Sequence, residues 1–136
     1  MQRRQGLAGL GAFLLALPML NSSANADNRL DGAWATTAAT CEEVFTKRNG
    51  ALTLKRTKEG WSAFIIRGNR LNGANATCSV KSSKQKGDVT TLLLECADRI
   101  MFDTITVSVR FKEDGTFVRF DPEFPEVETS YHRCDR

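Results

Sequence analysis

Apolar and polar side chains alternate along most of the chain beyond residue 26, and this two-residue period is typical of β-strands. The clearest example is the segment 104–112, in which polar residues separate Ile105, Val107, Val109 and Phe111. No long helix is expected, although residues 42–47 could form one helical turn. The pattern predicts about eight short strands, at residues 33–37, 52–55, 61–67, 76–81, 92–96, 104–112, 117–120 and 128–133. Turns are predicted at residues 58–60, 72–73, 84–88 and 113–115, each of which contains a glycine.

This number of strands in a short chain favours an all-β fold, in which one antiparallel sheet closes on itself as a small up-and-down β-barrel. Closure removes the exposed strand edges that promote aggregation, and it makes the first and last strands neighbours. A β-sandwich is the alternative arrangement of the same strands.

The first 26 residues have the pattern of a cleavable export signal. Arg3 and Arg4 precede an apolar run over residues 7–20, and Ala24-Asn25-Ala26 supplies a small-x-small cleavage pattern. The apolar run is shorter than the roughly 20 residues that a spanning helix needs, so no stable membrane insertion is expected. We therefore expect one exported domain, residues 27–136, in the bacterial periplasm, with secretion as the alternative.

Removal of this signal would change the charge of the chain. The whole sequence has 19 Lys and Arg against 16 Asp and Glu, and loss of Arg3 and Arg4 would leave a net charge of only +1. That value argues against nucleic acid as a partner. The charge is nevertheless uneven, at +6 over residues 27–86 and −5 over residues 87–136. Neighbouring antiparallel strands would cancel this division at the surface; the alternative is that it attracts a charged partner.

Four cysteines in a short exported chain indicate two disulfide bonds, for which three pairings exist. Cys78 and Cys96 both lie on the apolar side of a hairpin that turns near Gly87, which brings them opposite each other. That leaves Cys41 to pair with Cys134. Because the sequence has no Cys-x-x-Cys and one histidine, neither a zinc site nor any other cofactor is expected.

The sequence offers little catalytic chemistry, and no enzymatic activity is predicted. The single histidine, His132, shares a strand face with Ser130, but residues two apart on a strand are about 7 Å apart, too far for a direct hydrogen bond. The carboxylates of residues 121–128 lie around two prolines in what reads as an extended, solvated loop, where an acid of raised pKa is not expected.

Two features could instead bind a partner. The strand 61–67 is apolar on both faces, with Trp61 and Ile65 on the face that the core does not need, so that face must be covered or used. The stiff acidic loop at residues 121–126 could display Phe124. The alternative for Phe124 is that it folds back over one end of the core.

The Gly-x-Trp of residues 32–34, together with Arg133 on the last strand, resembles the opening and closing marks of the calycin barrels. That superfamily includes lipocalins, avidins and small periplasmic metalloprotease inhibitors of bacteria. The resemblance implies structural roles for two residues, in which Trp34 closes one barrel end and Arg133 packs over it.

Three functions are consistent with these features. The first is a monomeric binding module of the protease-inhibitor kind, which presents a loop or residues 27–29 to a protein partner. The second is a carrier that holds a small apolar ligand inside the barrel, and the third is a structural protein of the cell envelope. Cavity size separates the first two, because a barrel filled with side chains has no room for a ligand.

Overall fold

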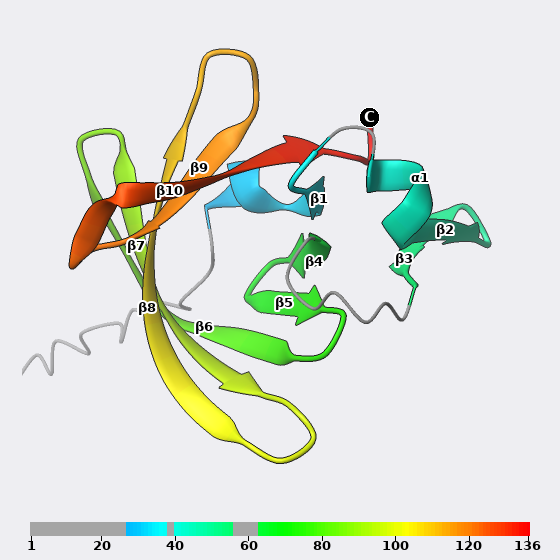
Figure 1. Ribbon diagram of the computed structural model, residues 1–136, viewed down its shortest axis with the longest axis horizontal. Helices are drawn as coiled ribbons and strands as arrows, with labels where there is room; N and C mark the ends of the chain where they lie inside the picture. The colour runs from blue at the N-terminus through cyan, green and yellow to red at the C-terminus, as the bar shows by residue number, and fades with distance from the viewer. Residues whose placement is uncertain (1–26, 38–39, 56–62) are drawn as a thin grey trace, which may run out of the picture.

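A closed barrel of eight antiparallel strands forms the body of the protein (Figure 1). The computed structural model describes residues 27–37, 40–55 and 63–136. Around the barrel the strands follow the order β1, β10, β9, β8, β7, β6, β5 and β4. Their bounds are β1 Gly32–Ala35, β4 Ala63–Arg67, β5 Arg70–Gly73, β6 Thr77–Lys86, β7 Val89–Ala97, β8 Phe102–Phe111, β9 Phe117–Asp121 and β10 Phe124–Arg133. The predicted barrel is confirmed, and the sandwich alternative is not what forms.

Strand β1 closes the barrel, because it pairs with β10 on one side and with β4 on the other. Trp34 lies opposite Arg133 of β10 and opposite Phe64 of β4. The first and last strands are therefore neighbours, as closure predicts. A short 3₁₀ helix, η1 (Asn28–Leu30), precedes β1 and places Leu30 in the core.

The number of barrel strands matches the prediction, but β5 takes the place of the strand predicted at residues 52–55. Residues 72–73 form no turn, because Asn72 pairs with Ile65 of β4 and with Thr77 of β6 as part of β5. The turn lies earlier, at Gly68, whose φ of +61° is readily adopted only by a residue without a Cβ. Asn72 and Gly73 thus form the end of strand β5, and the residue that marks the turn between β4 and β5 is Gly68.

The predicted strand at residues 52–55 lies outside the barrel. It is β3 (Ala51–Leu54), which pairs only with β2 (Phe45–Arg48) in a separate hairpin. A single turn of helix, α1 (Cys41–Val44), precedes β2, so the predicted helical turn is present but ends before residues 45–47. We call residues 41–54 the outer module, because Figure 1 shows them beside the barrel rather than in its wall.

Two apolar cores result from this arrangement. The interior of the barrel holds an aromatic cluster, in which the rings of Trp34 and Phe117 meet edge to face with centroids 4.7 Å apart. The second core lies between the outer module and the outer face of β1 and β4, where Phe45 and Ile65 are buried. Each such side chain contributes roughly 1.5–3 kcal/mol on burial, so the outer face of β4 is covered by the chain itself.

Both predicted disulfides are present. Cys78 and Cys96 are opposite each other in β6 and β7, with Cα atoms 4.0 Å apart, and both lie in the barrel core. Cys41 and Cys134, with Cα atoms 5.5 Å apart, join α1 to the residue that follows β10. The second bridge therefore fastens the outer module to the barrel; the barrel itself closes through β1 and β10.

Candidate functional site

Trp34 and Arg133 are in contact next to η1, at one end of the barrel. The indole of Trp34 donates a hydrogen bond of 2.7 Å to the carbonyl oxygen of Leu30, which satisfies its buried N–H. The guanidinium of Arg133 lies 4.9 Å from the centroid of the Trp34 ring and donates hydrogen bonds to the carbonyl oxygen of Asp31 and the carboxylate of Asp135. These contacts stack a cation on the aromatic ring and bring β10 against η1.

Gly32 has a steric role at this barrel end. Its φ is +139°, and a Cβ there would lie 2.7 Å from Nη2 of Arg133 and 2.8 Å from a carboxylate oxygen of Asp135. A larger residue would push the Arg133 side chain away from its partners. The glycine of the Gly-x-Trp segment is thus required by the close approach of the charged pair.

Residues 27–29, which the sequence suggested as a protein-binding end, pack against the same barrel end. The carboxylate of Asp27 accepts a hydrogen bond of 3.0 Å from the backbone N–H of Arg29 and pairs with its guanidinium. The side-chain hydrogen bond from Arg29 lowers the pKa of Asp27. The guanidinium of Arg29 also lies 4.3 Å from the ring centroid of Phe111, so this end is held to the barrel.

The interior of the barrel contains a cavity of only about 40 Å³. Ligand pockets typically measure about 300–1,000 Å³, so this space is too small for a drug-sized ligand. Its wall is mostly aliphatic and aromatic, but Arg119 and Tyr131 also line it. Burial raises the pKa of the Tyr131 hydroxyl, while the positive charge of Arg119 acts in the opposite direction.

An exposed apolar turn joins β7 to β8, and we call residues 98–102 the apolar tip. Ile100, Met101 and Phe102 are consecutive and expose 89%, 62% and 69% of their surface. The carboxylate of Asp98 accepts hydrogen bonds from the backbone N–H groups of Ile100 (2.8 Å) and Met101 (2.7 Å). These bonds lower the pKa of Asp98 and hold the turn in one conformation. The tip therefore presents apolar side chains on an ordered backbone.

Sequence reasoning missed the apolar tip, although the signal is present. The run Ile100-Met101-Phe102 breaks the alternation that holds in the strands on either side, and Asp98 stands two residues before it. An Asx turn followed by three apolar residues is typical of a displayed loop.

A second hairpin tip, residues 121–127, is acidic, and we call it the acidic tip. It is a tight turn and not the extended loop that the sequence predicted: the carboxylate of Asp121 accepts a 2.8 Å hydrogen bond from the N–H of Glu123, and β10 begins at Phe124. A register shift between Phe124 and Glu128 accommodates Pro125, and Pro122 lies in the turn before it. Phe124 is 57% exposed, so it is displayed and does not fold back over the core.

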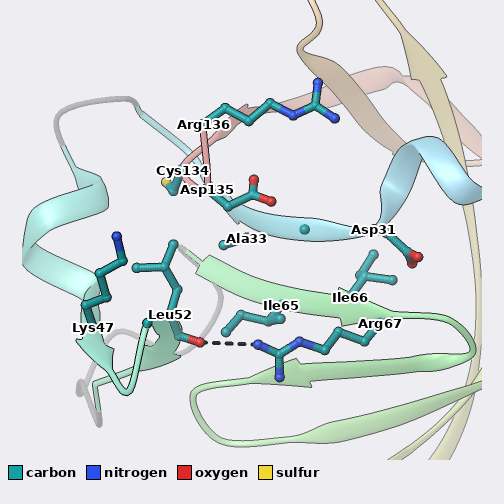
Figure 2. Close-up of a pocket in the computed structure, with 12 residues that line it drawn as sticks. Asp31, Ala33, Lys47, Leu52, Ile65, Ile66, Arg67, Cys134, Asp135 and Arg136 are labelled. Atoms are coloured by element: carbon teal, nitrogen blue, oxygen red, sulfur yellow. Dashed lines mark hydrogen bonds between the residues drawn. The ribbon is translucent and has the colours of Figure 1, made fainter.

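A groove of about 530 Å³ lies between the outer module and the barrel (Figure 2). Leu52 of β3 and Ile65 of β4 give it an apolar floor, and Ile65 is only 6% exposed. Lys47, Arg67 and Arg136 supply positive charge around it. Figure 2 shows these three side chains arising from β2, β4 and the segment after β10, so three separate parts of the chain build the groove.

Of the two carboxylates that line the groove, Asp135 is paired with a cation and Asp31 accepts a backbone hydrogen bond. Asp135 pairs with Nε of Arg133 at 3.0 Å, and Asp31 accepts a hydrogen bond of 2.9 Å from the N–H of Gly68. Among the described residues, Lys47, Arg67 and Arg136 have no carboxylate within 4.0 Å. The groove therefore combines an apolar floor with cations that are available to an anionic ligand.

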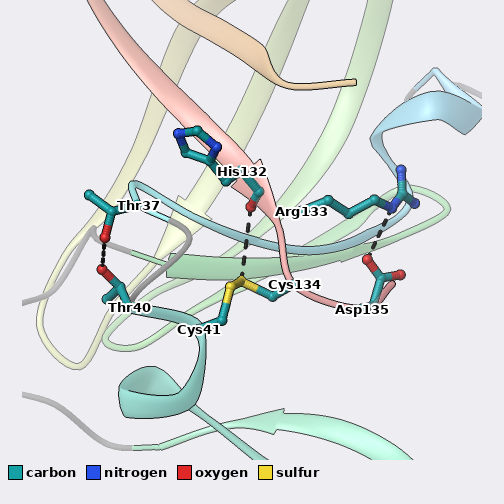
Figure 3. The surroundings of a disulfide bond; sticks show 7 residues. All are labelled: Thr37, Thr40, Cys41, His132, Arg133, Cys134 and Asp135. Atoms are coloured by element: carbon teal, nitrogen blue, oxygen red, sulfur yellow. Dashed lines mark hydrogen bonds and ion pairs between the residues drawn. A yellow bond between two sulfur atoms is a disulfide. The ribbon is translucent and has the colours of Figure 1, made fainter. Parts of the chain in front are cut away.

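Within residues 27–37, 40–55 and 63–136, the remaining candidate His132 lies outside both tips and outside the lining of the groove. The imidazole of His132 makes no hydrogen bond to another described residue, and Figure 3 shows it on the far side of β10 from the Arg133–Asp135 pair. No group of three metal-ligating side chains occurs in that part of the chain. Trp61 lies outside the described residues, as does the predicted export signal.

No helix in the described segments has the length and apolar character to cross a membrane. No protein-family model, curated protein or solved structure matches this chain.

Proposed function

We propose that this protein is a non-enzymatic, exported binding module that engages a protein partner through its apolar tip. The observation that carries the proposal is the consecutive exposure of Ile100, Met101 and Phe102 on a turn fixed by Asp98. Large apolar side chains on an ordered turn bind at a lower entropic cost than side chains on a loop that must first be ordered. A partner with an apolar cleft fits this surface.

The dimensions of the barrel favour this function over a carrier. An interior space of about 40 Å³ cannot enclose a drug-sized apolar ligand, whereas the exposed tip needs no cavity. Insertion of the tip into the cleft of an exported protease is the inhibitor-like form of the proposal. The two disulfides are compatible with an exported protein, and with residues 1–26 as an export signal we place the protein in the bacterial periplasm.

The experiment compares three versions of the full chain as baits in extracts of the cell envelope and culture medium. They are the natural sequence, the apolar-tip variant Ile100→Ser/Phe102→Ser, and a control that removes exposed apolar residues elsewhere, Phe124→Ser/Val127→Ser. We expect a protein that the natural chain and the control both retain, and that the apolar-tip variant retains at least about tenfold less, since buried apolar anchors dominate binding energy.

Circular dichroism should show the same fold for all three baits. Equal recovery of every protein by all three would contradict a role of the apolar tip. Recovery of a lipid or other small molecule without any protein partner would favour the carrier function instead.

A further inference from the structure

We infer that the groove beside the outer module receives the acidic tip of a second copy of this chain, so that copies associate head to tail. The inference concerns a different surface from the apolar tip and does not depend on the proposed partner. Cations of the groove and carboxylates of the acidic tip have no ion-pair partner among the described residues, and they lie on opposite sides of the molecule.

The groove supplies the positive half of the contact. Lys47, Arg67 and Arg136 surround an apolar floor formed by Leu52 and Ile65, and the groove measures about 530 Å³. Arg67 makes one long hydrogen bond of 3.4 Å, to the carbonyl oxygen of Leu52, which leaves most of its guanidinium donors open to a ligand. An occupant should therefore carry several carboxylates and at least one apolar side chain.

The acidic tip has this composition. Asp121, Glu123 and Glu126 have no Lys or Arg nitrogen within 4.0 Å among the described residues, whereas the next acid, Glu128, is paired with Arg110 at 2.5 Å. Phe124 and Val127 are 57% and 66% exposed between these carboxylates. The tip thus offers unpaired carboxylates and exposed apolar side chains to a groove that has cations around an apolar floor.

The two surfaces cannot meet within one molecule. Figure 1 shows the turn between β9 and β10 projecting from one side of the barrel, and β2 and β3 at the opposite side. A contact between different surfaces of identical copies is heterologous, so it extends into rings or open chains rather than stopping at a symmetric pair. Because exposed ion pairs are individually weak, the association should be concentration-dependent and sensitive to salt. The monomer expected from the sequence is then the form at low concentration.

Sedimentation velocity of the full chain, from about 1 μM to about 1 mM, tests the inference. The groove variant is Lys47→Glu/Arg67→Glu, and the tip variant is Glu123→Lys/Glu126→Lys. A control of equal charge change is Lys84→Glu/Lys86→Glu, which alters exposed lysines at the end of β6. All of these positions are exposed, so thermal unfolding should show that each variant is folded.

We expect the natural chain and the control to form dimers and larger species, and both single-surface variants to associate at least about tenfold more weakly. An equimolar mixture of the groove variant and the tip variant should recover association, because the natural tip of one variant meets the natural groove of the other and the two reversed surfaces are again opposite in charge. A rise in ionic strength from about 0.15 M to about 1 M should weaken association of the natural chain.

Three results would overturn the inference. They are a monomer at every concentration, association that survives the groove variant, and association that the groove variant abolishes while the tip variant leaves it intact. The last result would mean that the groove accepts a segment other than the acidic tip. The apolar-tip variant Ile100→Ser/Phe102→Ser should associate like the natural chain, so this inference and the proposed function fail independently.

Discussion

Replacement of Cys41 and Cys134 by alanine should lower the free energy of unfolding by several kcal/mol. The bridge joins residues 93 positions apart, whereas Cys78 and Cys96 are 18 positions apart. In the chain-entropy model, closing loops of these two lengths in the unfolded chain stabilises the folded state by about 4.7 and about 3.2 kcal/mol at 25 °C, respectively. A domain of ordinary stability has about 5–15 kcal/mol in total, so loss of the long bridge removes a large part of it.

Removal of the shorter bridge also costs packing energy in the folded state. The dependence of stability on urea concentration separates this packing loss from the effect of the bridge on the unfolded chain. Cys78 and Cys96 lie in the barrel core, so Cys78→Ala/Cys96→Ala also loses buried contacts, at about 1 kcal/mol for each methylene-sized group. The slope of stability against urea instead reports how far the unfolded chain expands. It should rise more in Cys41→Ala/Cys134→Ala, because that variant releases the longer loop.

Urea unfolding followed by circular dichroism measures both quantities, with the Cys78→Ala/Cys96→Ala variant as the matched control. Peptide mapping without reductant should first show that the bridge left in each variant is intact. If the Cys41→Ala/Cys134→Ala variant lost less than about 1 kcal/mol and its slope did not change, the loop-closure reasoning would be refuted, because the bridge would then constrain neither state.

Two further predictions concern the barrel end. Arg133→Ala should destabilise the fold by about 2 kcal/mol, because it removes both the stacking on Trp34 and the hydrogen bond to the carbonyl oxygen of Asp31. Thermal unfolding measures this loss, and Arg133→Lys should recover only part of it. Asp27→Asn should cost about 0.5–1 kcal/mol at neutral pH. Since the folded-state pKa of Asp27 lies below the ordinary value of 3.8, this difference should stay constant well above pH 3.8 and vanish as the pH falls through the lower value. A difference that persisted in strong acid would contradict the carboxylate pairing.

The features of the fold that the sequence predicted are those that follow from side-chain alternation and covalent geometry. Cys78 and Cys96 share the apolar face of one hairpin, so their pairing followed from strand parity and left a single partner for Cys41. Strand membership in the barrel did not follow in the same way. Residues 52–54 alternate like any barrel strand, and only the tertiary arrangement places them in the outer module.

The candidate binding surfaces were harder to predict, because each depends on what lies next to a residue in space. Ile65 was expected on a face that is either covered or used, and it is buried by the outer module while lining the floor of the groove. The cations of that groove come from three separate segments that no sequence motif connects. Phe124 was expected either on display in a stiff acidic loop or folded back over the core; it is exposed, on a tight turn instead of an extended loop.

One disulfide lies next to the apolar tip, and the other lies next to the groove. Cys96 is two residues before Asp98, so its bridge to Cys78 joins β7 to β6 immediately below the apolar tip. Cys134 lines the groove, and its bridge to Cys41 holds the outer module against the barrel. In each case the covalent bond adds to apolar packing, because Cys78 and Cys96 lie in the barrel core and the second core packs the outer module on β1 and β4. Because ordering a loop on binding costs free energy, this placement favours recognition at the surface of the barrel over capture inside it.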